Sequence, residues 1–410
     1  MSATTKQKKL VPELRFSGFD GEWSSKKLED IAEYKNGGAF ENNLVVGGKY
    51  NLITLNSIDI KGNLKAEHKT VSYADWYLQK NDLVMVLSDV AHGNFLGLVD
   101  VIPVDNKYVL NQRMGLLRKV DTAINLRFLR LNINLNQQYF KLHGQGSSQQ
   151  NLSKGDILKF KVVAPTSKEQ QKIADFLGSV DAWLDNLHGQ KTALQSYKQG
   201  MMQKLFTGQV RFKDEAGKSF PDWEEKELGD VFNAVKGAGI SKEQLDADGK
   251  NECILYGELY TVYSEQVFEV RSKTNVSSGT RSKVGDLLVP CSTTTTAIDL
   301  ANVTALNKEN VLLGGDITAL RSKTEVDSVF YAYYLSNHKK RDLAKYGQGV
   351  TIIHVYYSHF KDMQIDVPSL PEQQKIADFL TALDQTITAK ADEITKVEEW
   401  KKGLMQKMFV

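Results

Sequence analysis

Long apolar runs, paired cysteines and paired prolines are all missing from this 410-residue chain. No apolar run approaches the roughly 18 residues that a membrane-spanning helix needs. The two cysteines, Cys253 and Cys291, match neither a CxxC redox motif nor a cysteine metal site. The seven prolines include no adjacent pair, which excludes the Asn-Pro-Pro-aromatic motif of amino-methylating enzymes. Together these absences predict a reduced, cytoplasmic protein.

Motifs of catalysis and of cofactor binding are missing as well. The segment AGKS at 216–219 lacks the first glycine of a phosphate-binding loop, because Phe212 stands at that position. No HExxH, no GxSxG and no GxGxxG after a strand is present, and the seven histidines are scattered along the chain. The sequence therefore predicts a binding protein with no catalytic residues, no cofactor and no metal site of its own.

Charge is unevenly distributed, although the net charge is only +2. Residues 1–165 contain 22 Lys and Arg against 16 Asp and Glu, whereas residues 216–367 contain 17 against 21. Non-specific adhesion to a polyanion would require both regions to be basic. If nucleic acid is the partner, its recognition must depend on local patches and on shape.

The chain contains two copies of one sequence unit. EQQKIADFL occurs at 169–177 and again at 372–380, an offset of 372 − 169 = 203 residues. The same offset relates other pairs of segments, namely KQGMMQKLF and KKGLMQKMF, HGQG and YGQG, and MGLLR and ITALR. Two copies of about 200 residues are too few and too long for a solenoid. The sequence therefore indicates a tandem duplication.

The two copies differ most in two internal segments. SDVAHGNFLGLV at 88–99 corresponds to PCSTTTTAIDLA at 290–301, and GSSQQNLSKGD at 146–156 corresponds to GVTIIHVYYSH at 349–359. A shared scaffold with different loops is what two separate recognition surfaces require. Neutral drift of surface loops after duplication would produce the same contrast, so both interpretations stand.

Each copy ends in a segment with the spacing of a long helix. Apolar residues recur at alternating steps of four and three, which is the heptad spacing of a coiled-coil seam. Lys191, Lys198, Lys390 and Lys401 interrupt this seam, which would cost stability but would fix the register or the orientation of the helices. We expect the two helices to pack on each other, the alternative being that each packs only on its own domain. The predicted seam residues are Ile173, Leu177, Val180, Leu184, Leu187, Leu194, Met201, Leu205, Ile376, Leu380, Leu383, Ile387, Ile394, Val397, Leu404 and Met408.

The repeats and helical segments predict an α+β fold with two similar mixed α/β domains. Strand patterns such as DLVMVL and DLLVP alternate with helical patterns such as VDSVFYAYYLSNHKKRDLAKY. The expected organisation is a tail at 1–11, a first domain at 12–165, a long helix at 166–211, a second domain at 212–367 and a second long helix at 368–410.

Two variable domains, each followed by a helix that opens P-x-x-x-E-Q-x-x-I-A-x-F-L, resemble the specificity subunits of type I restriction–modification systems. The segments concerned are APTSKEQQKIADFLGSVD and VPSLPEQQKIADFLTALD, with WSSKKLEDIAEYKNGG and WEEKELGDVFNAVKGAG at the domain openings. One departure is Thr166-Ser167-Lys168, which stands where the second copy has Ser369-Leu370-Pro371. The resemblance implies an antiparallel coiled coil between the two helices, with one target-recognition domain at each end.

The resemblance also implies partners. Each domain would read one half of a bipartite, asymmetric site in double-stranded DNA, and the helices would set the gap between the halves. Two methyltransferase subunits and two motor–nuclease subunits would join the chain and would bind S-adenosylmethionine, ATP and Mg²⁺. A scaffold that gathers two partner proteins without reading DNA is the main rival hypothesis. An autonomous nuclease is disfavoured, since no acidic metal site stands out in the sequence.

Polar residues of the variable segments are the candidate base contacts, because Gln and Asn suit adenine and Arg suits guanine in the major groove. A plain solvated loop remains an equal alternative for each of them. In the first domain they are Ser88, His92, Asn94, Gln145, Ser147, Ser148, Gln149, Gln150 and Asn151. In the second they are Thr293, Thr294, Thr295, Gln348, Thr351, His354, Tyr356 and Tyr357. The candidate phosphate contacts are Lys35, Arg113, Lys236 and Lys345.

Overall fold

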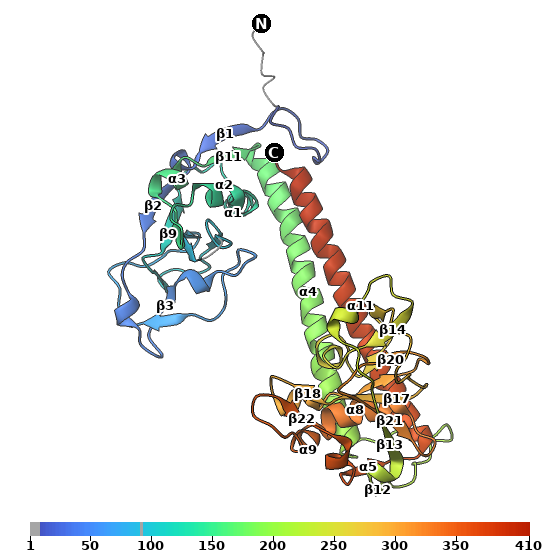
Figure 1. The fold of residues 1–410 in the computed structure, drawn as a ribbon. Coiled ribbons are helices and arrows are strands. Elements are labelled where there is room, and N and C mark those ends of the chain that lie inside the picture. The colour runs from blue at the N-terminus through green and yellow to red at the C-terminus, as the bar shows by residue number, and fades with distance from the viewer. Residues whose placement is uncertain (1–8, 91–92) are drawn as a thin grey trace. The chain divides into compact units, whose positions relative to one another are not determined.

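The computed structural model of this chain describes residues 9–90 and 93–410. The chain divides into two compact units, one of Met1–His188 with Glu393–Val410 and one of Gly189–Asp392. Each unit holds one mixed α/β domain and a stretch of both long helices, α4 (Ser167–Phe206) and α11 (Leu370–Met408), which are green and red in Figure 1. The prediction of two similar domains with two long helices is confirmed. Within the described residues, no helix is long and apolar enough to cross a membrane.

The strands of the first domain form two larger sheets and two strand pairs. They are β1 (Ser24–Lys27), β2 (Ala32–Asn36), β3 (Tyr50–Ile53), β4 (Lys69–Val71), β5 (Leu83–Val86), β6 (Ser88–Val90), β7 (Val99–Val101), β8 (Tyr108–Leu110), β9 (Met114–Lys119), β10 (Gln149–Asn151) and β11 (Lys161–Ala164). The sheet orders are β2-β9-β5-β7 and β4-β3-β8, and the pairs are β1 with β11 and β6 with β10.

The strands of the second domain repeat this arrangement. They are β12 (Glu224–Glu227), β13 (Phe232–Lys236), β14 (Asn251–Ile254), β15 (Gln266–Val267), β16 (Ser272–Thr274), β17 (Asp286–Pro290), β18 (Ser292–Thr293), β19 (Thr304–Leu306), β20 (Leu312–Leu313), β21 (Ile317–Ser322), β22 (Ile353–His354) and β23 (Gln364–Val367). The orders β13-β21-β17-β19-β15, β16-β14-β20, β12-β23 and β18-β22 match those of the first domain, with β15 added at one edge. The two copies that the sequence indicates therefore share the same strand order in their sheets.

Short helices connect these strands in both domains. The first domain has α1 (Leu126–Leu135), α2 (Gln137–His143), α3 (Lys154–Leu158) and 3-10 turns η1 (Leu28–Asp30), η2 (Glu41–Asn43) and η3 (Leu55–Ser57). The second has α5 (Leu228–Val231), α6 (Glu258–Thr261), α7 (Ala297–Leu300), α8 (Ser328–Tyr333), α9 (Lys340–Ala344), α10 (Tyr357–Phe360), the 3-10 turn η4 (Lys242–Gln244) and the π-helical turn η5 (Tyr334–His338).

The central strand of each domain separates two apolar clusters. Leu83 and Met85 of β5 face the cluster that contains α1, whereas Val84 and Val86 face the cluster over the second sheet. Successive side chains of a strand point to opposite faces, so a strand between two clusters must be apolar throughout. This explains why DLVMVL and its counterpart DLLVP are nearly continuous apolar runs.

The middle of each helix packs on the other helix, as the heptad spacing predicts. Val180, Leu184 and Leu187 of α4 form one cluster with Ile394 and Val397 of α11 in the first unit. All sixteen predicted seam residues are buried or half-buried. The helices are antiparallel, and the expected coiled-coil pairing is confirmed.

The ends of the seam differ from the prediction, because they enter the domain cores. Ile173, Leu177 and Met408 belong to the core of the first domain. Ile376 and Leu380 belong to the core of the second. Each domain closes around one end of the helix pair, so packing on a domain and packing on the other helix occur in the same helix.

Two of the seam lysines form ion pairs with the facing helix. Lys198 reaches both carboxylate oxygens of Asp384 at 2.7 Å in the second unit. Lys401 pairs with Asp181 in the first unit. Both lysines and both aspartates are related by the offset of 203, so this interhelical ion pair occurs at equivalent positions in the two units.

The repeated nonapeptide fastens each long helix to its domain. Glu169 is buried and accepts hydrogen bonds from Nε and Nη2 of Arg15, both at 2.8 Å. Glu372 is buried in the same way and accepts from Nε and Nη2 of Arg211 at 3.0 and 2.8 Å. A bidentate guanidinium pair satisfies a buried carboxylate that would otherwise be costly. The repeated glutamate therefore has the same guanidinium partner in both units.

The first glutamine of the nonapeptide also forms a hydrogen bond with the domain in both copies. The Oε1 atom of Gln170 accepts from the N–H of Asn125 at 2.8 Å, and the Oε1 atom of Gln373 accepts from the N–H of Asp327 at 2.9 Å. Asn125 and Asp327 are the N-caps of α1 and α8. The motif thus ties the start of each long helix to the start of a domain helix.

The segment that opens the first domain contacts the end of α11 in the first unit. The N–H of Leu14 donates to the carbonyl of Lys407 at 2.8 Å. In the second unit the N–H of Val210 donates to the carbonyl of Lys204 at 3.1 Å, where the chain is continuous. The same backbone contact therefore follows the end of each long helix.

Candidate nucleic-acid interface

The two variable segments of the first domain are brought together by strand pairing. β6 and β10 pair with Ser88 opposite Asn151, and the Ser88 hydroxyl donates to Oδ1 of Asn151 at 2.5 Å. A hairpin at 145–151 is closed by reciprocal backbone hydrogen bonds of 3.0 and 2.9 Å between Gln145 and Asn151. Segments about 60 residues apart in the sequence thus form one surface.

The candidate contacts of the first domain differ in exposure. Ser88 is buried, which gives it a supporting role beneath the surface, and Gln149 and Gln150 are half-buried. The Oδ1 atom of exposed Asn94 accepts from Lys141 at 2.9 Å. His92 lies outside the described residues. The other exposed candidates are Lys35, Arg113, Gln145, Ser147, Ser148 and Asn151.

The second domain forms the same surface from β18 and β22. Ser292 pairs with His354, and Thr293 pairs with Ile353. The Ser292 hydroxyl lies 2.8 Å from Nδ1 of His354. Gln348 and His354 close the hairpin with backbone hydrogen bonds of 2.9 and 2.7 Å. The sequence therefore folds into equivalent sites in the two units.

The candidates of the second domain divide in a similar way. Thr293 is buried and supports the surface, and His354 and Tyr357 are half-buried. The Tyr357 hydroxyl donates to the carbonyl of Phe232 at 2.6 Å, so it serves the fold. The exposed candidates are Lys236, Thr294, Thr295, Lys345, Gln348, Thr351 and Tyr356.

Glycine shapes both hairpins. Gly146 has φ +117° and Gly349 has φ +125°, a conformation that side chains rarely adopt. A Cβ atom on Gly146 would lie 2.1 Å from the carbonyl oxygen of Gln149, and one on Gly349 would lie 2.0 Å from that of Ile352. The repeated GQG of the sequence is thus the start of one hairpin in each domain.

Charged and aromatic groups border the second hairpin. The ring of Tyr356 stacks on that of His354 with centroids 5.6 Å apart, and Nζ of Lys236 lies 6.0 Å from the Tyr356 centroid. Hydrogen bonds from the hydroxyls of Thr296 and Thr295 lower the pKa of Asp299, at the start of α7. The Thr295 hydroxyl is therefore held by a carboxylate that stays ionised near neutral pH.

Two apolar residues at the second hairpin were absent from the predicted contacts. Val350 is 99% exposed and Ile352 is 48% exposed. Their counterparts 203 residues earlier are Ser147 and Gln149. Selecting only polar residues missed these two side chains, although they stand inside the divergent segment 349–359.

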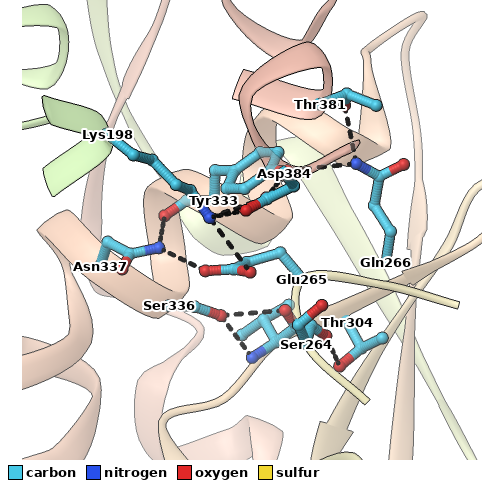
Figure 2. A network of polar contacts seen from close by, with 11 residues as sticks. Lys198, Ser264, Glu265, Gln266, Thr304, Tyr333, Ser336, Asn337, Thr381 and Asp384 are labelled. Carbon is cyan, nitrogen blue, oxygen red and sulfur yellow. Dashed lines mark hydrogen bonds and ion pairs between the residues drawn. The ribbon is translucent and has the colours of Figure 1, made fainter. Parts of the chain in front are cut away.

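A polar network holds the second domain on its helices (Figure 2). Asp384 of α11 accepts hydrogen bonds from Lys198 of α4 and from the buried Tyr333 of α8. Gln266 donates to the Thr381 hydroxyl at 2.7 Å. Burial, together with Asp384, raises the pKa of Tyr333, so this phenol keeps its proton. These contacts fix the orientation of the domain that carries β18 and β22.

Within the described residues, no three His, Cys, Asp or Glu side chains gather into a group that could hold a metal ion. The exposed side chains at the two paired-strand surfaces include amides, hydroxyls, aromatic rings and cations, besides the apolar Val90, Val350 and Ile352. The polar groups suit hydrogen bonding to base edges and phosphates.

Comparison with known proteins identifies one family. The model of the type I restriction modification DNA specificity domain matches residues 20–196 and again 221–399. The putative type I restriction enzyme MjaX specificity subunit of Methanocaldococcus jannaschii is 26% identical over 69% of this chain and 70% of its own length. The MjaVIII specificity subunit of the same organism is 22% identical over 84% of this chain and 82% of its own length.

Solved structures share the fold. A type I restriction–modification S subunit from M. genitalium has a TM-score of 0.59 at 18% identity and covers 98% of this chain and 99% of its own. A chain from a study of complex assembly and conformational transition of the type I restriction–modification system has a TM-score of 0.57 at 15% identity, with 94% and 97% covered.

Proposed function

Because this chain belongs to the family of the type I restriction–modification DNA specificity domain, we propose that each of its two domains reads one half of a bipartite, asymmetric DNA target. The chain is the sequence-recognition subunit of a type I restriction–modification system. The observation that carries this function is the presence of two equivalent surfaces, β6 with β10 and β18 with β22, that bear different side chains. Equivalent backbones with different side chains would read different bases.

Direct readout would use the exposed amides and hydroxyls of the two hairpins. Gln145 and Asn151 border the first hairpin, and Gln348 borders the second. Amide side chains can form paired hydrogen bonds with adenine in the major groove. Lys35, Arg113, Lys236 and Lys345 are exposed and would bind phosphates, which position the protein without reading sequence.

The helix pair would set the gap between the two half-sites. α4 and α11 contain 40 and 39 residues, a length of about 60 Å at 1.5 Å per residue. Half-sites that lie on one face of the duplex are about 34–36 Å apart. Helices of this length are therefore sufficient to span the distance.

The helix pair also offers a surface for protein partners in each unit. Trp183 and Trp400 are 44% and 47% exposed in the first unit, and Tyr197, the counterpart of Trp400, is 51% exposed in the second. Exposed aromatic side chains are enriched at protein interfaces. We propose that two methyltransferase subunits dock here and that two motor–nuclease subunits join them.

Catalysis in this assembly would belong to the partner subunits. The chain presents no sequence motif for a nucleotide or for S-adenosylmethionine. We propose that S-adenosylmethionine, ATP and Mg²⁺ bind to the partners, that this chain is non-catalytic, and that the complex acts in the cytoplasm.

Exchange of one domain tests this function. Residues 212–367 would be replaced by the corresponding region of a relative, and the methylated sequence would be mapped in cells that express the chain with its methyltransferase. We expect one half of the methylated sequence to change and the other half to stay. An unchanged methylation pattern would reject DNA reading and favour a scaffold that only gathers partner proteins.

Salt dependence provides a second check on the same complex. Phosphate contacts release counterions, so the logarithm of the binding constant should fall linearly with the logarithm of the salt concentration, with a slope of about −0.9 for each phosphate neutralised. Removing Lys236 or Lys345 should each lower that slope by about one. A response that is flat in salt would contradict DNA as the ligand.

A further inference from the structure

The hairpin of the second domain ends in an apolar tip. Val350 and Ile352 flank Thr351, and all three are exposed. The hairpin is closed at its base by Gln348 and His354, and Gly349 supplies the positive φ of its turn. Val350, with 99% of its surface exposed, makes almost no contact with its own domain. Its side chain is therefore available to a ligand.

The first domain has the same hairpin with a polar tip. Ser147, Ser148 and Gln149 occupy the positions of Val350, Thr351 and Ile352 at the offset of 203. Both hairpins are closed by an equivalent backbone pair and turn through an equivalent glycine. The backbone of the hairpin is shared, so the two hairpins differ in the chemistry of their tips.

The size of the apolar tip points to a small ligand group. Two aliphatic side chains cover far less than the roughly 1,200 Å² that a stable protein interface buries. Nζ of the exposed Lys236 lies 6.0 Å from the ring centroid of Tyr356, two residues after the end of the hairpin, and this cation favours a polyanion over an apolar protein surface. Among the edges that base pairs present in the major groove, the apolar group is the 5-methyl of thymine.

We propose that Val350 and Ile352 contact thymine 5-methyl groups, so that the half-site of the second domain requires thymine at one or two positions. The first domain, with serine and glutamine at its hairpin tip, reads its half-site by hydrogen bonds and without a methyl contact from that tip. This inference rests on the proposed function, since it names the bases that one of the two surfaces recognises.

Uracil substitution tests the inference, because uracil keeps the hydrogen-bonding edge of thymine and lacks only the methyl group. The full chain in complex with its methyltransferase would first select its target from a random duplex library. Each thymine of each half-site would then be replaced by deoxyuridine, one at a time. We expect binding to weaken about fourfold per methyl lost in the half-site of the second domain, the factor expected for one buried methyl-sized group.

A variant with the polar tip identifies the residues. In Val350→Ser with Ile352→Gln, which copies the first hairpin, thymine and uracil duplexes should bind equally at the second half-site. Both residues are exposed, so the melting temperature and the selection of the first half-site should not change. The matched control, Ser147→Val with Gln149→Ile, should leave the thymine preference of the second half-site intact.

The outcomes separate this inference from the proposed function. If no half-site is selected at all, the proposed function fails and the inference fails with it. If both half-sites are selected but uracil binds as well as thymine throughout the second, only the inference fails. If the polar-tip variant loses affinity equally for thymine and uracil duplexes, the tip acts as a wedge between base steps, and the methyl contact is likewise overturned.

Discussion

At the scale of single residues, one arginine–glutamate pair in each unit joins a long helix to its domain. Glu372 is fully buried and accepts hydrogen bonds from Arg211 and from Nε1 of Trp223, the latter at 3.0 Å. Removing one partner of a buried ion pair leaves an uncompensated charge, which destabilises proteins by about 3–5 kcal/mol. The pair is therefore a point where a single substitution should be severe.

We predict that Arg211→Leu lowers the free energy of unfolding by about 3 kcal/mol. The measurement is urea-induced unfolding of the full chain, followed by circular dichroism. Adding Glu372→Gln to the variant should recover part of the loss, because it removes the buried charge. Arg271→Leu, which changes an exposed arginine of the same unit, is the control. A stability of Arg211→Leu equal to that of the wild type would show that Trp223 alone satisfies the carboxylate.

Little of this residue-scale detail could be predicted from the sequence. The repeat begins at Glu169 and Glu372, but nothing in it identifies their partners Arg15 and Arg211, which lie 154 and 161 residues away. The pairing of Ser88 with Asn151 is equally non-local. Sequence patterns report local periodicity, whereas such contacts are determined by the closure of the whole domain. Because only polar residues were selected as candidate contacts, Val350 and Ile352 were also left out of the prediction.

At the scale of elements, the sequence was more informative. The heptad spacing predicted α4 and α11, and continuous apolar runs predicted β5 and β17. These patterns depend on which face of an element is buried, and the spacing of apolar residues within the element itself indicates that face. The spacing did not indicate where the seam leaves the helix pair and enters a domain core, because an apolar residue suits either environment.

The seam ion pairs yield a prediction for the helix pair. Lys401 and Asp181 are partly exposed, so screening by solvent limits their contribution. We expect Lys401→Asp to lower the free energy of unfolding by about 1 kcal/mol, since repulsion replaces attraction. Urea-induced unfolding at low salt is the measurement.

The reversed pair is the stringent control for that prediction. Lys401→Asp combined with Asp181→Lys should restore most of the stability, whereas Lys402→Asp, a change at the exposed neighbour, should have little effect. Failure of the reversed pair to recover stability would mean that Lys401 acts through its packing against the seam and not through its charge.

At the scale of the whole molecule, duplication provides two recognition domains and two copies of one interhelical ion pair. The ion pairs Lys198–Asp384 and Lys401–Asp181 place Lys191 opposite Ala391 by simple counting along antiparallel helices. The helices can therefore be lengthened in step, by insertions after Lys191 and after Lys390. A heptad keeps the seam in phase, because two helical turns return to the same face.

We predict that one heptad inserted at both positions lengthens the unspecified gap of the DNA target. Seven residues add about 10.5 Å to each helix, which corresponds to about three base pairs of duplex at 3.4 Å per base pair. Three base pairs also rotate one half-site by about 100°, so binding should weaken even at the new best gap. Affinity for duplexes whose gap varies by single base pairs measures both effects. Seven residues inserted instead into the exposed turn at 246–248 should leave the gap unchanged. If the lengthened helices select the original gap with the original affinity, the distance between half-sites is determined elsewhere in the complex.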